Sequence, residues 1–572
     1  MKKRYVLFLI PLILYLALLG GMPQMEPDEA RYSLIASAMN ESGNYVTPHI
    51  KQTIYLEKPP LVSWVTAMAF KVFGENDFSA RLFAGLCAWG CILLTFFIGR
   101  HFRDEKTGLY SAAILTISIF PFVLGRINIL DMPLTLFLCL SVWMGYLFLT
   151  SGKKRYLYLT YLACALGFLT KGLIGVILPA AILFLWLCWT KRWRQILTLI
   201  SPVGMVIFLA VVGPWIYLAQ KENQDFLWFF FVREHFLRFT TKMHGKTEPF
   251  YFFLPIILGG TLPWSAFLIR AWQPDRIKEW LFGKDENKLL IVWFLFIFLF
   301  YTVSSSKLAP YIAPVFLPLA LWAGCIFRNY EQELREPSGK QKEFYRIVVS
   351  LQSIIVMIAL LVPPILNTYS DPAKGLVAMT SDAWWIYMLP TFCAAAMLAF
   401  LPDWIARKKG KNWFLTLYLI GSVFLAGMVF PINDFLYPYR SALVAKEAIA
   451  GYVPRDALLY QYRENFYGID FYNKIRTAIV EDFGELGDGI AKLPPAEKKK
   501  YFLSRDEFFD KIKNEKETYC ITQHRNKLKE IQDRCSDVTI LWDNRAFYLL
   551  KIGQGIKEQG SRNKVQGSRI KD

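Results

Sequence analysis

The sequence begins with MKKRYVLFLIPLILYLALLGG (residues 1–21), in which a basic start precedes a run of about sixteen apolar residues. No small-x-small cleavage site follows this run, so we expect an uncleaved first transmembrane helix. Similar runs recur along the chain, and 54% of its 572 residues are hydrophobic. Soluble globular proteins of this length are less apolar, so the sequence predicts an α-helical polytopic membrane protein.

A membrane span needs about twenty mostly apolar residues, and the chain contains about thirteen segments of this kind. We place them near residues 5–21, 78–99, 108–124, 132–150, 156–170, 172–189, 196–218, 251–269, 289–304, 311–327, 347–366, 383–401 and 413–431.

The distribution of Lys and Arg predicts the orientation of these spans. One alternate set of connecting segments carries about 26 Lys and Arg in about 60 residues, and the other set carries about half as many in about 125 residues. Because positive residues stay on the cytoplasmic side, the N-terminus is predicted to be inside. The C-terminal region and the loops 22–77 and 219–250 are then extracytoplasmic. The net charge of +19 resides in these short clusters, so we expect no nucleic-acid partner.

The composition becomes polar from about residue 435. Short apolar segments alternate there with helical stretches such as DEFFDKIKNEK and HRNKLKEIQ, which predicts an extracytoplasmic α/β domain over residues 435–553. Its most distinctive aromatic stretch is YRENFYGIDFY (462–472). Residues 1–434 form the predicted transmembrane domain, and 554–572 a disordered tail. The segments predicted as strands are ALLYQY, TAIVE, YFLS, TYCIT, DVTILW and AFYLLKI.

None of the nine cysteines has the spacing of a metal-binding motif. Seven lie in apolar runs, where Cys packs as a small hydrophobic residue. Cys520 and Cys535 lie in the polar C-terminal region, where an extracytoplasmic location would permit a disulfide between them. The sequence leaves both states of this pair open.

The first outer loop contains MEPDEARYSLIASAMNESG (residues 25–43), whose apolar residues recur at helical spacing. We expect a short amphipathic helix lying on the outer membrane surface. Asp28, Arg31 and Tyr32 share one face of this helix, because residues three and four apart are neighbours. Asp28 either serves this shared face or simply complements the positive end of the helix dipole.

A second stretch of the same loop, YLEKPPLVSW (residues 55–64), places Glu57 and Lys58 just before a helix whose first turn contains two prolines. Free backbone N–H groups make such a helix end attractive to an anion, and a neighbouring Lys strengthens a phosphate site. The alternative is a Lys that reaches toward the membrane surface and a Glu that caps the helix.

Further charges lie at the outer ends of later spans. Asp131, in GRINILDMPLT, opens the fourth span, where an Asp is commonly a helix cap. Lys171 lies in a tight outer turn. It either joins the other charged residues of the outer face or acts as an anchor at the membrane interface. In the loop 219–250, REHFLRF contributes Glu234, His235 and Arg238. Two His in this loop, Glu234 and Glu57 suit a divalent metal, although an isolated His is more often a surface residue.

The predicted topology brings these groups to one membrane face. Ionisable groups gathered at a membrane edge indicate a functional site. Their mixture suits a phosphate carried on a lipid, with cations for the phosphate and carboxylates for an attacking group or a metal. The residues on this face are Asp28, Arg31, Glu57, Lys58, Asp131, Lys171, His235, Arg238 and Tyr311.

The order PDEARY, YLEKPPLVSW, an Asp opening a later span and REHFLRF resembles the bacterial aminoarabinose transferases that modify lipid A. These are membrane glycosyltransferases of the GT-C fold, related to protein O-mannosyltransferases. The motifs cover about residues 1–330 and are more specific for the superfamily than for the sugar. The resemblance implies a sugar donor built on a polyprenyl phosphate, undecaprenyl phosphate in bacteria, used on the periplasmic side of the inner membrane.

The resemblance also implies roles for individual residues. Asp28, Asp131 and Lys58 match catalytic positions, and Glu57 with His235 matches a pair that holds a divalent metal (Zn, Mg or Mn). The remaining positions match residues that contact the substrate or its phosphate, namely Arg31, Tyr32, Tyr55, Lys171, Arg238 and Tyr311.

The expected reaction is an inverting transfer of aminoarabinose to a lipid A phosphate. Other acceptors, a protein Ser/Thr or another surface glycan, fit the same chemistry. A transporter of lipid-linked sugars is the alternative from another class, but transporters place ionisable residues near mid-membrane and often have repeated halves. Here the charges lie in outer loops, which favours an enzyme.

Overall fold

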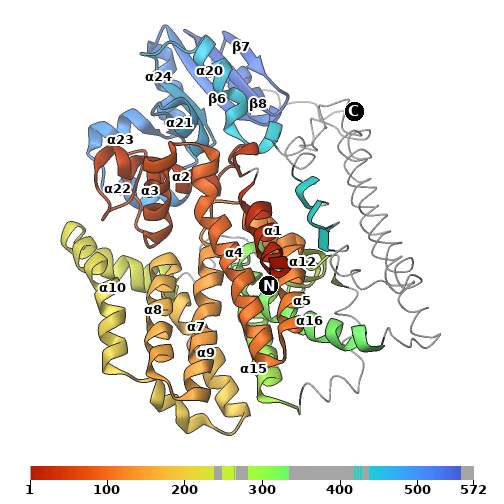
Figure 1. Ribbon diagram of the computed structural model, residues 1–572. Coiled ribbons are helices and arrows are strands. Elements are labelled where there is room, and N and C mark those ends of the chain that lie inside the picture. Colours follow the sequence, from red (N-terminus) through yellow and green to blue (C-terminus); the bar gives the residue numbers. More distant parts are fainter. Residues whose placement is uncertain are drawn as a thin grey trace, which may run out of the picture.

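The computed structural model describes residues 2–17, 19–237, 248–262, 264, 265, 281, 283–333, several residues between 418 and 429, and 437–555. A layer of long helices forms one part of the molecule, and a unit built around a β-sheet lies at one end of that layer (Figure 1). Between them lie the short elements of the first outer loop. The described residues therefore combine long helices with one β-sheet unit.

Within the described residues, five helices are long and apolar enough to cross a membrane: Asp77–Phe102, Asp131–Ser151, Pro202–Glu222, Asp285–Val303 and Ala309–Asn329. The last comprises the 3-10 turn η4 (Ala309–Val315) and helix α16 (Phe316–Glu333). The first four are α4 (Asp77–Phe102), α7 (Asp131–Ser151), α10 (Pro202–Glu222) and α15 (Asp285–Val303). Shorter helices of this layer are α1 (Lys2–Leu16), α5 (Glu105–Thr116), α8 (Lys154–Lys171) and α9 (Ile174–Trp189).

Two predicted spans differ in the structure. The span predicted at 108–124 is broken into α5 and the short helix α6 (Ile119–Leu124), with Pro121, which lacks a backbone N–H, in the first turn of α6. The span predicted at 196–218 begins later, because the Ser201 side chain caps α10 by accepting a 3.2 Å hydrogen bond from the Gly204 N–H.

Other predicted spans extend beyond the described residues. Of the span predicted at 251–269, the structure describes α12 (Phe253–Gly260) and a few residues after it. The predicted spans 347–366 and 383–401, and most of 413–431, lie outside the described residues, so the number of spans stays a prediction.

Glycines allow neighbouring helices of the layer to approach closely. A Cβ on Gly108 of α5 would lie 2.5 Å from the carbonyl oxygen of Phe96 in α4, and a Cβ on Gly175 of α9 would lie 2.3 Å from the carbonyl carbon of Gly167 in α8. In a lipid environment helices associate through such close packing rather than through burial of apolar surface from water.

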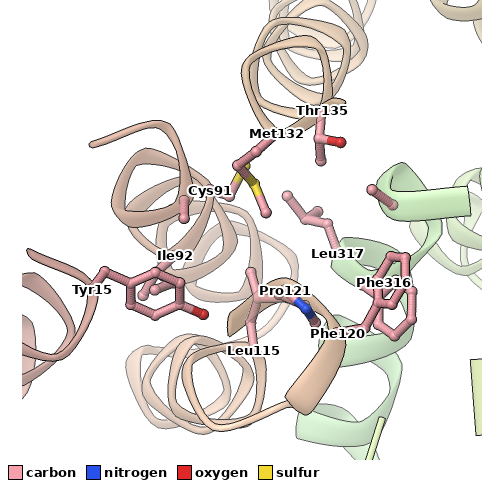
Figure 2. Close-up of a pocket in the computed structure, with 12 residues that line it drawn as sticks. Tyr15, Cys91, Ile92, Leu115, Phe120, Pro121, Met132, Thr135, Phe316 and Leu317 are labelled. Carbon is pink, nitrogen blue, oxygen red and sulfur yellow. The ribbon is translucent and has the colours of Figure 1, made fainter. Parts of the chain in front are cut away.

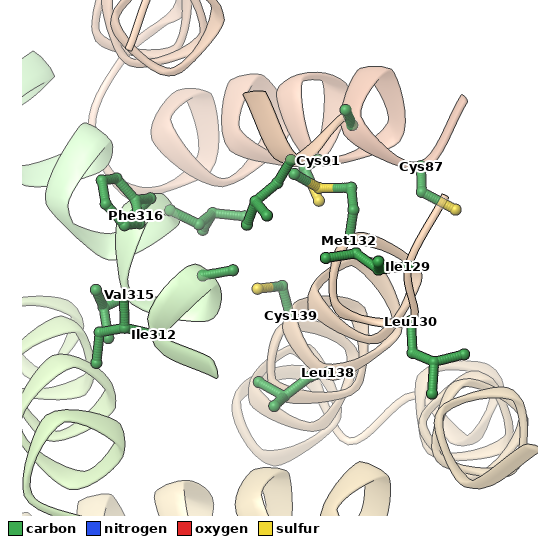
Figure 3. Packing of buried hydrophobic residues seen from close by; sticks show 14 of the residues in the cluster. Cys87, Cys91, Ile129, Leu130, Met132, Leu138, Cys139, Ile312, Val315 and Phe316 are labelled. Carbon is green, nitrogen blue, oxygen red and sulfur yellow. The ribbon is translucent and has the colours of Figure 1, made fainter. Parts of the chain in front are cut away.

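The helical layer is packed with apolar side chains from α4, α7 and η4, including Cys139, Leu138 and Ile312 (Figure 3). A small cavity between α1, α4, α6, α7 and α16 is lined by groups such as Tyr15, Cys91 and Phe316 (Figure 2). No charged side chain lines this cavity. We therefore regard it as a packing gap within the layer.

The first outer loop contains helices α2 (Asp28–Ser42) and α3 (Leu61–Phe73), with a small hairpin of β1 (His49–Ile50) and β2 (Thr53–Ile54) between them. The prediction that α2 lies on the membrane surface is wrong. Most of its residues are buried, because α2 packs between α3 and helix α21 (Tyr467–Asn473) of the C-terminal unit.

The C-terminal unit contains a six-stranded sheet in the order β5-β4-β3-β6-β8-β7. The strands β5, β4, β3 and β6 are parallel to one another. Strand β8 runs antiparallel to both of its neighbours, β6 and β7. Each of the six predicted segments overlaps one of these strands. Cys520 and Cys535 are buried thiols rather than a disulfide. The strands are β3 (Leu459–Tyr462), β4 (Ala478–Val480), β5 (Phe502–Leu503), β6 (Glu517–Gln523), β7 (Val538–Asp543) and β8 (Phe547–Gly553).

A buried ion pair joins the first outer loop to the C-terminal unit. The Lys51 ammonium donates to the Asp470 carboxylate at 2.6 Å and to the Thr477 hydroxyl at 2.5 Å. The Gln461 amide donates to the same hydroxyl at 2.7 Å. The Lys51 and Asp470 side chains are 1% and 4% exposed. The unit is thus held to the loop by charges that have no access to water.

Candidate functional site

Arg31 of α2 lies at the centre of the first group of charges. Its guanidinium donates to the carboxylates of Asp28 and Glu485. It also lies over the rings of Tyr32 and Tyr55, at 5.4 and 5.8 Å from their centroids. Four residues predicted from the sequence are therefore neighbours here, although Tyr55 comes from a different part of the loop.

Glu485 is a member of this group that sequence reasoning missed. It lies in the short turn η7 (Gly484–Leu486) of the C-terminal unit, 454 residues away from Arg31. The Tyr55 hydroxyl donates to the same carboxylate at 3.1 Å. Burial raises the pKa of Tyr55, so this hydroxyl keeps its proton and acts as a donor. Nothing in the surrounding FGELGDG segment indicates this role, because it arises from tertiary packing alone.

The second group lies where α7 and α8 pack together. Asp131 is the first residue of α7 and Lys171 the last residue of α8, and their side chains form an ion pair of 2.7 Å. The Lys171 ammonium also lies 4.3 Å from the ring centroid of Tyr311 in η4. The Asp131 side chain does not cap α7, whose cap position is Leu130. The capping alternative for Asp131 is therefore wrong.

The third group surrounds Lys58, just before α3. Its ammonium lies 3.8 Å from the Glu57 carboxylate and 3.5 Å from that of Glu234. Glu234 comes from the π-helical segment η3 (Trp228–Leu237). Pro60 occupies the cap position of α3, so the helix begins one residue after the two prolines rather than with them.

Two tyrosines lie within electrostatic reach of more than one of these groups. Burial raises the pKa of both the Tyr32 and Tyr55 hydroxyls, Arg31 opposes this effect, and nearby carboxylates add to it. Asp131 of the second group acts on Tyr32, and Glu57 of the third group acts on Tyr55. We call seven charged residues of the three groups the outer charge cluster: Asp28, Arg31, Glu57, Lys58, Asp131, Lys171 and Glu485.

Among the residues that the structure describes, no three His, Cys, Asp or Glu side chains converge on a point that could hold a metal ion. Glu57 lies beside Lys58, which also faces Glu234. The side chain of His235 and the whole of Arg238 lie outside the described part of the chain, so their predicted roles stay predictions. The described residues alone do not assemble the ligand set of a metal site.

Glu26, two residues before Asp28, is anchored to α21. Its carboxylate accepts hydrogen bonds from the backbone N–H groups of Tyr467 at 3.0 Å and Gly468 at 2.6 Å. Burial raises the pKa of Glu26 to about 8, against the opposing effect of these two donors and of Lys51. The segment that carries Asp28 is thus held by a carboxylate that titrates near neutral pH.

Glu26 is therefore expected to make the stability of the protein depend on pH. Its pKa in the folded protein lies above its value of 4.5 in an unfolded chain, so its contribution is complete below about pH 4.5 and is lost as the pH rises through about 8. Thermal unfolding of the wild type and Glu26→Gln between about pH 5 and 9 tests this. The unfolding temperature should fall more steeply for the wild type, and parallel curves would contradict the assignment.

Comparison with known proteins agrees with this arrangement. The family model described as dolichyl-phosphate-mannose-protein mannosyltransferase matches residues 57–218, which include Lys58, Asp131 and Lys171. The undecaprenyl phosphate-alpha-4-amino-4-deoxy-L-arabinose arabinosyl transferase 2 of Pseudomonas fluorescens (strain Pf0-1) is 33% identical over 440 residues. That alignment covers 72% of this chain and 78% of the relative. The chain belongs to this arabinosyl transferase family.

Other family members and solved structures are consistent with that assignment. The corresponding transferase of Pectobacterium atrosepticum is 27% identical over 74% of this chain and 76% of its own length. The crystal structure of ArnT from Cupriavidus metallidurans bound to undecaprenyl phosphate has a TM-score of 0.78 at 23% identity, over 96% of this chain and 98% of that chain. The GT-C fold expected from the arabinosyl transferase resemblance is thereby confirmed.

Proposed function

We propose that this arabinosyl transferase family member moves 4-amino-4-deoxy-L-arabinose from undecaprenyl phosphate to a lipid A phosphate. The observation that carries the proposal is the outer charge cluster, in which Arg31, Lys58 and Lys171 each face a carboxylate. A protein built only to span the membrane has no need of such a cluster at the outer ends of its helices. The names of the relatives supply the sugar and the lipid carrier.

The cations of the cluster suit the phosphate of the donor. Arg31, Lys58 and Lys171 lie in surroundings with limited access to water, where charge interactions are stronger than in bulk solvent. In the structure their partners are carboxylates, which resemble a phosphate in charge and in their oxygen acceptors. A bound phosphate would therefore take over contacts that Asp28 and Glu485 make with Arg31.

The proposed reaction is a single displacement at the anomeric carbon. An acceptor oxygen forms a bond to this carbon while the bond to the donor phosphate breaks, so the configuration inverts. The electron pair of the breaking bond leaves with undecaprenyl phosphate, and Arg31, Lys58 and Lys171 stabilise the added negative charge.

Asp28 is the carboxylate best placed to act on the acceptor or the sugar, because its side chain is 57% exposed although it pairs with Arg31. A lipid A phosphate is already ionised and needs no base, so Asp28 would orient the sugar or its amino group. If the acceptor is a hydroxyl, Asp28 would accept its proton instead. The first role predicts little dependence of the rate on pH, and the second predicts a rate that depends on pH.

The proposed location of this site is the periplasmic face of the bacterial inner membrane. Asp131 and Lys171 lie at one end of the α7–α8 pair, whereas the turn at the other end carries Lys153, Lys154 and Arg155. Basic turns stay in the cytoplasm, which supports the opposite placement for the cluster. Residues 1–434 are then the transmembrane domain, and 435–553 an extracytoplasmic α/β domain.

A divalent metal held by Glu57 and His235 remains a separate prediction within this function. Treatment of the purified enzyme with a chelator tests it. Loss of transfer that returns on addition of Zn, Mg or Mn supports the metal, and full transfer in the chelator contradicts it. No step of the reaction given above passes through such an ion.

The proposed function is tested by mass spectrometry of lipid A from a host that lacks its own transferase and makes the aminoarabinose donor. Expression of the wild-type protein should add the mass of one aminoarabinose residue. If the folded protein is present in the membrane and lipid A is unchanged, the sugar or the acceptor is wrong. Analysis of surface glycans and proteins from the same cells then tests the alternative acceptors.

Replacing Lys171 by methionine is expected to lower the rate of transfer about 100-fold, because one cation that stabilises the leaving phosphate is lost. Methionine keeps much of the length of the side chain, and the initial rate with purified enzyme is the measurement. Lys154→Met, at the exposed opposite end of α8, is the matched control and should keep full activity. Equal rates for the two variants would remove Lys171 from the site.

A further inference from the structure

Tyr467 and Asn465 form a polar pair that the proposed reaction does not yet use. The Asn465 amide N–H donates to the Tyr467 hydroxyl at 3.0 Å. Tyr467 is 3% exposed, and its ring packs in the same apolar cluster as Tyr32 and Tyr55. The Asn465 side-chain oxygen is buried and accepts no hydrogen bond from the residues that the structure describes. A buried acceptor without a donor costs stability, which a function can explain.

Tyr467 lies near the segment that carries Asp28, because α21 packs against α2 and the Tyr467 N–H donates to Glu26. Burial raises the pKa of the Tyr467 hydroxyl, and the charges that act on it are Arg31, Glu485, Glu26 and Glu57. These residues come from both halves of the first outer loop and from η7. The hydroxyl thus lies within electrostatic reach of Arg31 and Glu57, although it belongs to the C-terminal unit.

The pair follows the carboxyl end of strand β3, a position that agrees with a binding role. Strand β3 has β4 on one side and β6 on the other, so the order of the parallel strands reverses at β3. In open α/β sheets, ligands bind beyond the carboxyl ends of the strands at such a reversal. The segment that follows β3 carries Asn465 and leads directly into α21, which packs against α2 (Figure 1).

Tyr467 is held in place through its backbone. Its N–H donates to Glu26 at 3.0 Å, and the next residue, Gly468, approaches the same carboxylate so closely that a Cβ there would lie 2.6 Å from it. Glu26 is two residues from Asp28. The hydroxyl of Tyr467 therefore keeps a set position relative to the segment that carries Asp28.

The chemistry of the pair suits a neutral polar ligand group. The hydroxyl proton of Tyr467 and the side-chain oxygen of Asn465 provide one donor and one acceptor. Turning the amide by half a revolution exchanges the roles, because the hydroxyl then donates to the amide oxygen and the amide N–H groups become available. In both orientations the pair carries no charge, unlike Arg31, Lys58 and Lys171, which suit the phosphate.

We propose that Tyr467 and Asn465 recognise the polar substituents of the donor sugar and so contribute to the choice of sugar. This inference rests on the proposed function and deepens it by assigning recognition of the sugar to the C-terminal unit. A site built to hydrogen-bond a sugar substituent discriminates against lipids that lack it, because its polar groups are then left unpaired. The cations of the outer charge cluster would bind the lipid phosphate whichever sugar it carries.

The test measures binding of two lipids to the full-length enzyme without an acceptor: undecaprenyl phosphate carrying aminoarabinose, and bare undecaprenyl phosphate. Tyr467→Phe keeps the ring and removes the hydroxyl. We expect it to weaken binding of the sugar-carrying lipid about 3- to 10-fold, the effect of one neutral hydrogen bond, and to leave binding of the bare lipid unchanged. Asn465→Ala should shift the same ratio in the same direction.

Tyr452→Phe is the matched control, because Tyr452 belongs to the same unit and is 52% exposed. The proposal is overturned if Tyr467→Phe keeps the preference of the wild type, or if it loses affinity for both lipids equally. A wild-type enzyme that prefers neither lipid and transfers no aminoarabinose would instead overturn the proposed function. Transfer by the wild type with an unchanged preference in Tyr467→Phe would overturn this inference alone.

Discussion

Replacing Asp28 by asparagine is expected to lower the rate of aminoarabinose transfer about 100-fold if Asp28 orients the sugar, and up to about 10,000-fold if it acts as a base. Asparagine keeps the shape of the side chain and can still accept a hydrogen bond from Arg31. It cannot take up a proton, and it cannot offer a negative charge to the amino group of the sugar. The measurement is the initial rate of transfer by purified enzyme at matched concentration.

Asp488→Asn provides the control for this prediction. Asp488 also pairs with an arginine, Arg233, and it also joins the C-terminal unit to an outer loop. It lies outside the outer charge cluster, so we expect its loss to change the rate less than about threefold, as for an exposed ion pair. Similar rates for the two variants would show that Asp28 has no special role.

A pH–rate profile of the wild type then distinguishes a base from an orienting carboxylate.

The second large effect is expected on stability. Lys51→Met removes one partner of the buried pair with Asp470 and leaves a carboxylate with 4% exposure without its cation. Breaking a buried pair in this way costs about 3–5 kcal/mol, because the remaining charge stays desolvated. Gln461, the Thr477 backbone N–H and the Thr477 hydroxyl still donate to Asp470, at 3.3, 3.0 and 2.8 Å, and these neutral donors compensate only in part. Thermal unfolding of the full-length protein measures the loss.

Lys474→Met is the matched control for Lys51→Met. Lys474 also links the two parts of the molecule, through Glu75, but its side chain is 51% exposed. An exposed pair contributes less than about 1 kcal/mol, so this variant should unfold near the wild-type temperature. We also expect limited proteolysis to release the C-terminal unit faster in Lys51→Met than in Lys474→Met. Equal losses in both variants would contradict a special role for the buried pair.

Much of this architecture follows from local sequence patterns. The apolar runs predict helices such as α4 and α7, because about twenty apolar residues suffice to cross a membrane and satisfy their own backbone hydrogen bonds. The six short segments after residue 435 predict the strands for a similar reason, since strand periodicity is written in neighbouring residues. Asp28, Arg31 and Tyr32 are neighbours because helical spacing places them on one face.

Sequence patterns were misleading where the surroundings of an element decide its role. Helix α2 carries the spacing of a surface helix, but α3 and α21 cover it from two sides. Asp131 occupies a position typical of a helix cap, yet its carboxylate turns to Lys171 on the neighbouring helix. In both cases a local signal competes with a contact that the local sequence does not contain.

The apolar runs predicted the spans, and the order of motifs resembles a membrane glycosyltransferase family, because both are features of neighbouring residues. Only the packing of distant elements brings the C-terminal unit against the outer charge cluster. Glu485 meets Arg31 across 454 residues, and Tyr467 meets Glu26 across 441. Contacts at such separations depend on how whole helices and strands pack against one another. The residues next to each partner in the sequence carry no pattern that predicts them.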